Sequence, residues 1–218
     1  MLFLRMKTSD MDEKTKDYLL LCGIKSAWHS RSFSDFTNDE DALEAVKKYL
    51  KRYKQMLNLG VGLYLWGSNG TGKTHLLTSA FKELILDKGC KARMFTMDEI
   101  VDKFTSTWYS DTDKKEFNDL LRKTEFLGID EFGKNVDKDG KPMYLPDLVK
   151  RAMESIIRFR VQMHRPIWFT SNTDPQFVKE VFSEDIASLL REAVVAVCVR
   201  GDDYRRKIQT RNKRELLK

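Results

Sequence analysis

The chain has 218 residues, of which 33% are charged and 41% hydrophobic, so it is long enough to bury a core of its own. Its three cysteines stand far apart, without a CxxC pair or a histidine cluster, which argues against a disulfide scaffold and a zinc site. No apolar run approaches the length of a membrane span, and the N-terminal apolar patch is too short for a signal peptide, so we expect a cytoplasmic protein without membrane contact.

The predicted elements alternate along the chain between short apolar runs and longer helical patterns, which is typical of a parallel sheet with crossover helices. The strands are predicted at Val61–Trp66, Ala92–Thr96, Phe126–Ile129, Ile167–Thr170 and Val194–Val199. The helices are predicted at Asp39–Leu57, Lys73–Leu86, Met97–Thr107, Lys114–Lys123, Leu145–Met163, Pro175–Phe182 and Ser183–Arg191, with a short one around Met11–Leu21. Continuously apolar strands such as VVAVCV predict a five-stranded α/β sheet covered by helices on both faces.

The domain organisation follows from the same pattern. We expect a short N-terminal helical segment (1–22), a core (23–203) without a large separate lid domain, and a basic tail (204–218). The net charge of +6 lies entirely in that tail, which has seven basic residues and one acid. Such a tail can contact nucleic acid or an acidic protein surface, although a solvated terminal helix is the alternative.

A phosphate-binding motif lies between the first long predicted strand and the helix after it. The run GSNGTGKT fits GxxxxGK[ST] at every defined position, and it comprises Gly67, Ser68, Asn69, Gly70, Thr71, Gly72, Lys73 and Thr74. The glycines allow a tight turn whose backbone N–H groups converge on phosphates, and the helix N-terminus adds its dipole. We expect Lys73 to reach the outer phosphates and Thr74 to offer a hydroxyl to Mg²⁺.

A carboxylate pair follows the third predicted strand, in FLGIDEFG. We assign Asp130 to Mg²⁺ and Glu131 to polarising an attacking water. The next strand ends in IWFTSNTD, where Asn172 could orient that water; an asparagine that caps a turn is the alternative. A small-molecule P-loop kinase has no need of Glu131, so the pair favours an ATPase that hydrolyses ATP to ADP and phosphate.

These motifs together resemble the AAA+ family of P-loop NTPases, in the branch of DnaC/DnaI-type replicative helicase loaders and IstB transposition ATPases. The resemblance covers about residues 22–206 and is carried by GSNGTGKTHL, FLGIDEFG, RPIWFTSN and VRGDDYR. It implies that ATP is bound by the P-loop and by His75, which continues the motif. It also implies that Arg205 contacts the nucleotide or a neighbouring subunit, as the terminal arginine of the branch does.

Members of this branch act as rings or spirals in which a neighbour's arginine touches the γ-phosphate. The usual position of that arginine holds Leu189 here, and Arg191 comes two residues later, rotated about 200° around a helix. Arg160 matches another arginine that is common in the branch and is a rival candidate. A surface salt bridge is the alternative for either residue.

The resemblance also implies a contact with single-stranded DNA between the second and third strands. The candidates are Trp108, Tyr109, Lys114, Lys115 and Arg122, which offer stacking faces and positive charge. Phe104 and Trp108 are spaced i and i+4, so packing of one helix onto the sheet is the alternative, and for Phe104 the better one.

The function implied by the resemblance is an ATP-dependent helicase loader in DNA replication. It would self-associate with ATP, bind single-stranded DNA and deliver a replicative helicase. Two alternatives remain open at this point: an IstB-like transposition ATPase that binds DNA and a transposase, and a nucleotide-gated interaction protein that does not hydrolyse ATP.

Overall fold

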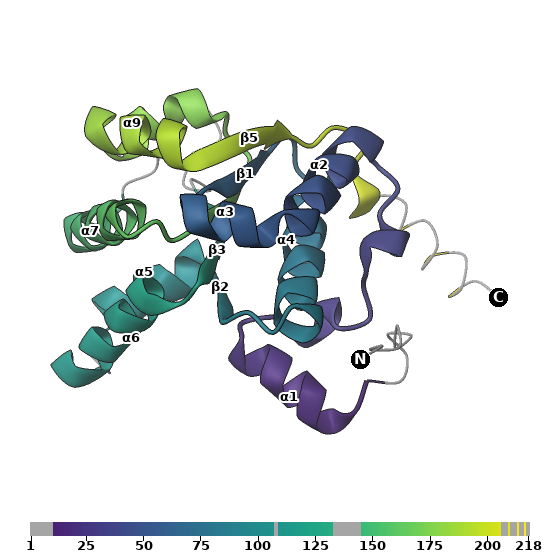
Figure 1. Cartoon of the computed structure of the whole chain (residues 1–218), viewed down its shortest axis with the longest axis horizontal. Coiled ribbons are helices and arrows are strands. Elements are labelled where there is room, and N and C mark those ends of the chain that lie inside the picture. Colours follow the sequence, from purple (N-terminus) through teal and green to yellow (C-terminus); the bar gives the residue numbers. More distant parts are fainter. Residues whose placement is uncertain are drawn as a thin grey trace.

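A computed structural model describes residues 11–106, 109–132 and 145–205, together with single positions 209, 213 and 216 (Figure 1). Five parallel strands form one sheet in the order β2-β3-β4-β1-β5. The strands are β1 (Gly62–Trp66), β2 (Ala92–Thr96), β3 (Phe126–Asp130), β4 (Ile167–Ser171) and β5 (Val194–Cys198). Each lies within one residue of its predicted bounds, so the predicted parallel α/β sheet is confirmed.

Helices connect these strands in the predicted order. They are α1 (Glu13–Leu21), α2 (Glu40–Lys51), α3 (Tyr53–Leu59), α4 (Lys73–Lys82), α5 (Met97–Thr105), α6 (Asp111–Lys123), α7 (Asp147–Gln162), α8 (Val178–Val181) and α9 (Glu184–Ala193). Short 3₁₀ turns lie at Ser26–Trp28 (η2), Phe33–Asp35 (η3) and Pro175–Phe177 (η5), and a π-turn at Glu83–Asp87 (η4) extends α4. The single helix predicted over Asp39–Leu57 is interrupted at Arg52, whose backbone leaves the helical region. Within the described ranges no helix is long and apolar enough to cross a bilayer.

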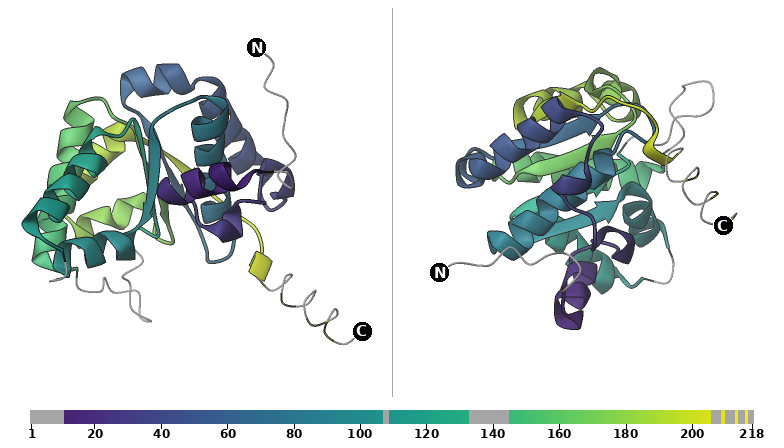
Figure 2. Two further views of the ribbon diagram at one scale, coloured as in Figure 1. Left: turned by 90° about the horizontal axis from the view of Figure 1, so that it is seen from below. Right: turned by 90° about the vertical axis from the view of Figure 1, so that its right-hand side faces the viewer.

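The sheet separates two buried clusters, because successive side chains of a strand point to opposite faces. Leu63 and Leu65 of β1 pack with α2 and α4, whereas Tyr64 between them packs with α5, α7 and α9. The two helical layers stand on opposite sides of the strands in the left view of Figure 2. Helices on both faces, without a large separate lid among the described residues, are therefore confirmed.

The strand β5 differs from the expectation that its apolar run is covered on both faces. It forms one edge of the sheet, paired with β1 from Gly62↔Val194 to Trp66↔Cys198, and Val195 is 52% exposed. An apolar sequence shows that a strand favours burial, but it does not show whether the strand ends up at an edge.

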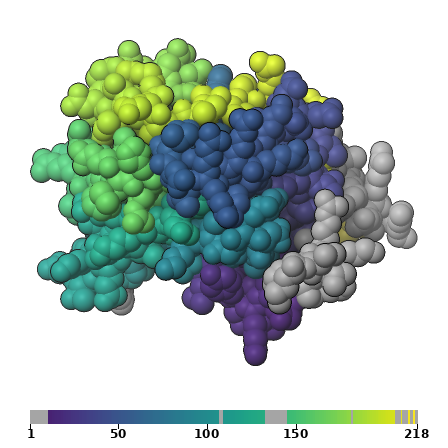
Figure 3. Space-filling view, viewed as in Figure 1, coloured from purple at the N-terminus to yellow at the C-terminus, as the bar shows by residue number. Residues whose placement is uncertain are grey.

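The helix α1 belongs to the core rather than to an appendage. Leu19 and Cys22 are fully buried in the same cluster as α4, and Met94 on the outer edge of β2 donates its N–H to the Cys22 carbonyl at 2.8 Å. Gly23 makes this approach possible, since its φ is +87° and a Cβ there would lie 1.8 Å from the Met94 oxygen. In the space-filling view α1 forms the purple projection at the lower edge (Figure 3).

Candidate functional site

The glycine-rich loop between β1 and α4 closes tightly over the N-terminus of α4. Gly70 and Gly72 have φ values of +77° and +100°, which side-chain-bearing residues rarely adopt. A Cβ at Gly70 would lie 1.8 Å from the Asp203 carboxylate, and one at Gly72 would lie 2.6 Å from the Phe36 ring. The loop therefore has the conformation that its glycines predict, with the first turn of α4 and its dipole beneath it.

The ammonium of Lys73 is folded back over its own loop. Its Nζ donates to the carbonyl oxygens of Gly67 at 2.9 Å and Ser68 at 2.7 Å. Burial lowers the pKa of Lys73 to about 8; the Asp130 carboxylate opposes this shift, and the positive charge of Arg205 adds to it. An anion bound near both cations would relieve their repulsion, so the arrangement favours a phosphate group.

The hydroxyl of Thr74 and the carboxylate of Asp130 meet, although they are 56 residues apart. Thr74 Oγ1 donates to Asp130 Oδ1 at 2.9 Å, and Thr170 Oγ1 donates to the same carboxylate oxygen. Burial raises the pKa of Asp130; the hydrogen bonds from Thr170 and Thr74 oppose this, and the charge of Glu131 adds to it. A hydroxyl and a carboxylate are the hard oxygen ligands that Mg²⁺ takes, so the pair fits that ion.

Glu131 follows β3 in a left-handed conformation, with φ of +60°. Its backbone N–H donates to Thr170 Oγ1 at 2.9 Å, so one β4 hydroxyl fixes both carboxylate residues. β4 lies between β1, which leads into the phosphate loop, and β3. Strain of this kind in a residue other than glycine costs on the order of 1–3 kcal/mol and is concentrated at functional sites.

A cavity of about 350 Å³ joins these groups, a size within the range of roughly 300–1,000 Å³ typical of ligand pockets. Its walls come from residues 27, 28, 31, 35–38, 69–75, 131, 170–172, 204 and 205. Most of the predicted site therefore gathers in one place: Asn69–His75 of the loop, Glu131, Asn172 and Arg205. Asn172 follows β4 directly, as expected.

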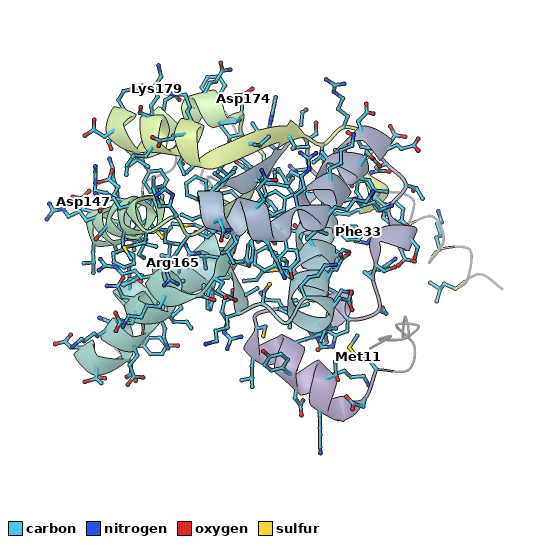
Figure 4. All side chains as sticks on the ribbon, in the orientation of Figure 1. Met11, Phe33, Asp147, Arg165, Asp174 and Lys179 are labelled. Carbon is cyan, nitrogen blue, oxygen red and sulfur yellow. The ribbon has the colours of Figure 1, made fainter. Side chains whose placement is uncertain are left out.

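One end of the cavity is aromatic. The His75 ring lies 5.9 Å from the Trp28 ring and 5.7 Å from the Phe36 ring, between centroids. Because a carbonyl can only accept, His75 Nε2 donates to the Ser32 oxygen at 2.7 Å, and burial lowers the His75 pKa. Phe33, labelled in Figure 4, marks this segment beside α4. Flat aromatic groups at one end and cations at the other suit a nucleotide.

The buried ammonium of Lys82 on α4 holds the backbone of this aromatic segment. Its Nζ donates to the carbonyl oxygens of Trp28 at 2.8 Å and His29 at 3.1 Å, and also to that of Arg31. Burial lowers the Lys82 pKa to about 8, and Asp35 opposes the shift.

The structure corrects the prediction that Arg160 reaches a neighbour's nucleotide. Its side chain is fully buried, and its guanidinium donates to five backbone carbonyls around the end of α6. Arg165, labelled in Figure 4, lies beside it and donates to the Lys123 carbonyl. Arg160 therefore fastens α7 to α6 and does not reach the surface.

Arg191 lies on the exposed surface of α9 and pairs with Glu184, Nη2 to Oε1, at 2.9 Å. It does not line the cavity. Its role toward a neighbouring subunit stays a prediction.

The candidate DNA residues do not form one cluster. Trp108 lies outside the described residues. Tyr109 is 37% exposed, and Lys103 Nζ lies 3.7 Å from its ring centroid, near the α6 end that carries Lys114 and Lys115. Arg122, in the last turn of α6, instead donates to Ser155 Oγ of α7 at 2.6 Å. Phe104 packs against Phe117 in the core, as expected.

Sequence reasoning missed several cavity residues, notably Asn38, Thr170 and Tyr204. Thr170 has a usable signal, because it lies in FTSN on the strand next to β3. Asn38 has none, since its hydrogen-bond partners Thr71 and Asp202 are 33 and 164 residues away.

The parallel sheet and the glycine-rich loop before α4 form the fold of the AAA+ P-loop NTPases. The sequence pattern of the AFG1-like ATPases matches residues 27–215, and the chain belongs to that family. The chain is also 25% identical over 172 residues to the replicative helicase loader DnaC of Buchnera aphidicola subsp. Acyrthosiphon pisum (strain APS). The predicted resemblance to DnaC/DnaI-type proteins is thus confirmed.

The curated relatives are longer than the region they share with this chain. The alignment covers 78% of this chain and 66% of that DnaC, and only 41% of the helicase loader DnaI of Bacillus subtilis (strain 168). Among solved structures, the DnaC helicase loader has a TM-score of 0.67 at 18% identity, covering 81% of this chain and 100% of that one. The replication initiator DnaA bound to AMPPCP and single-stranded DNA has a TM-score of 0.63 at 20% identity, covering 82% and 51%. These structural matches establish the fold.

Proposed function

We propose that this protein is an ATP-dependent helicase loader in DNA replication. The observation that carries the proposal is the convergence of the P-loop, Glu131 and Arg205 on one cavity, with Asp130 hydrogen-bonded to Thr74 in its wall, in a chain whose curated relatives include DnaC and DnaI. Bound ATP would favour self-association on single-stranded DNA and on a replicative helicase, and hydrolysis would release them. A role in replication would place the protein in the cytoplasm.

Each residue at the cavity has its own role in the proposed ATPase reaction. Lys73 exchanges its loop carbonyls for the outer phosphates, while the N–H groups of the loop face the same oxygens. Thr74 and Asp130 would hold Mg²⁺. When bound, the ion would neutralise part of the negative charge of the phosphates. Glu131 accepts the proton of an attacking water, and Asn172 orients that water. Arg205 adds positive charge from the C-terminal segment that lines the cavity.

Loading is tested by size-exclusion chromatography of the protein with a purified hexameric replicative helicase. We expect a complex of the two in ATP that weakens in ADP. Failure to form such a complex in either nucleotide, while ATP is bound normally, would contradict the loader assignment and leave the nucleotide site intact.

Lys73→Ala should weaken ATP binding by about 10- to 100-fold, because a charge-assisted contact with phosphate is worth roughly 1.5–3 kcal/mol. A titration with a fluorescent ATP analogue measures this affinity. Lys88→Ala is the matched control, because Lys88 is paired with Glu83 outside the cavity. Equal affinity of wild type and Lys73→Ala would contradict the assignment of the site.

Removing residues 206–218 should weaken binding of single-stranded DNA and reduce its salt dependence, if the basic tail touches phosphates. The slope of log K against log salt should become shallower by about 0.7 for each phosphate that the tail neutralises in the full chain. The truncation keeps Tyr204 and Arg205, so ATP affinity serves as an internal control. An unchanged slope across a salt series would show that the tail does not contact the DNA.

A further inference from the structure

The side-chain amide of Asn38 joins the phosphate loop to the segment after β5. Its Nδ2 donates to the Thr71 carbonyl at 3.2 Å and to the Asp202 carbonyl at 2.9 Å. Both partners are carbonyl oxygens, which only accept, so the amide nitrogen must face them. Two donors in one fixed plane suit these two acceptors, and an isosteric carboxylate would offer none.

Contacts of neighbouring residues reinforce this junction. The Asp39 carboxylate accepts from the Arg200 N–H at 2.7 Å while it caps α2 by accepting from the Ala42 N–H at 3.0 Å. Gly201, with φ of +119°, lies so close that a Cβ there would be 3.0 Å from Asn38 Cβ. Residues 200–202 are thus held along the start of α2.

The same segment then runs back over the phosphate loop. The Tyr204 N–H donates to the Gly70 carbonyl at 3.0 Å, and Asp203 Oδ1, which crowds Gly70, accepts from the Arg205 N–H at 3.0 Å. Arg205 thereby lines the same cavity as Lys73, and its charge acts on the Lys73 ammonium. The Asn38 amide and the Asp39 carboxylate are side-chain links that hold the segment leading to Arg205, and of the two only Asn38 also binds the phosphate loop.

We propose that Asn38 is a positioning residue that holds Arg205 over the phosphate site, so that a bound nucleoside triphosphate is contacted from the loop and from the C-terminal segment. The inference rests on the proposed nucleotide site. A free arginine side chain loses roughly 2 kcal/mol of rotamer freedom when it is ordered, and a backbone already held in place adds no further ordering cost. Asn38 acts through Arg205, not by touching phosphate.

The test is a double-mutant cycle of Asn38→Asp and Arg205→Ala, read by titration with a fluorescent ATP analogue. Each single variant should lose about 10-fold in affinity, and the double variant should also lose about 10-fold rather than 100-fold. The reason is that Arg205→Ala removes a side chain that Asn38→Asp has already displaced from the phosphate site. Asn58→Asp on the exposed surface of α3 is the matched control and should bind as wild type does.

Independent losses that multiply to about 100-fold, or full affinity in Asn38→Asp, would overturn the positioning role. Thermal unfolding of each variant without nucleotide reports on folding, and Asn38→Ala repeats the cycle without an added charge. If wild type fails to bind ATP, or Lys73→Ala binds as well as wild type, the nucleotide site itself is wrong. Normal wild-type binding with an unaffected Asn38→Asp contradicts this inference alone.

Discussion

Glu131→Gln should bind ATP with close to wild-type affinity and hydrolyse it about 10²- to 10⁴-fold more slowly, the range that a positioned general base contributes. The substitution keeps the size of the side chain and the backbone N–H that donates to Thr170. It removes the carboxylate that we propose as the acceptor of a proton from water. Phosphate release under saturating ATP measures the rate, and the fluorescent ATP analogue measures the affinity.

The control for Glu131→Gln is Glu180→Gln, the same change on the exposed surface of α8. It should leave turnover unchanged. If Glu131→Gln turns over at the wild-type rate, Glu131 does not act as the base. If wild type itself binds ATP without turnover, alone and with helicase and DNA, the protein is a nucleotide-gated binder of the kind that the sequence left open.

The parts of the molecule that could be predicted from sequence are those with local causes. A P-loop needs its glycines and Lys73 within eight residues, and Asp130 and Glu131 directly end an apolar run, so each motif stands in one stretch of chain. The bounds of the three central strands β1, β3 and β4 were predictable because buried parallel strands are largely apolar. The structure adds that β4 lies between β1 and β3, which is why Thr170 reaches both carboxylate residues.

The features that could not be predicted depend on distant contacts. Asn38 has no motif, and the exposure of Val195 depends on β5 taking the edge of the sheet. Arg160 is different, because a periodic signal was present: Met153, Ile156 and Ile157 form the buried face of α7, and Arg160 continues it at helical spacing. The match of Arg160 to an arginine that is common in the branch was given more weight than this periodicity. It led to the wrong prediction that Arg160 contacts the nucleotide of a neighbouring subunit.

Arg160→Met should lower the free energy of unfolding by about 3–5 kcal/mol, because each buried carbonyl left without a donor costs roughly 1–3 kcal/mol. The guanidinium satisfies the carbonyls of Leu121 at 2.8 Å and Arg122 at 3.2 Å in the last turn of α6, which have no partner inside that helix. It also binds those of Thr124 at 2.9 Å, Glu125 at 3.0 Å and Pro166 at 2.8 Å, which lead into β3 and β4. Methionine fills the space but supplies no donor; the Pro166 carbonyl keeps the Leu127 N–H at 3.3 Å and the Thr124 carbonyl keeps Arg165 Nη1 at 3.4 Å, so the loss falls mainly on the other carbonyls.

Urea unfolding followed by circular dichroism measures this loss, and Arg158→Met provides the control on the exposed surface of the same helix. The control should change stability by less than about 0.5 kcal/mol. Arg160→Lys keeps the charge but offers three donors from one point. Its free energy of unfolding should therefore lie between those of Arg160→Met and Arg158→Met, and it gives a measurable value if Arg160→Met does not fold. Wild-type stability of Arg160→Met together with a loss of ATP turnover would return Arg160 to the catalytic role that its burial argues against. The opposite result shows that Arg160 fastens the C-terminal end of α6 to α7 and to the residues that lead into β3 and β4.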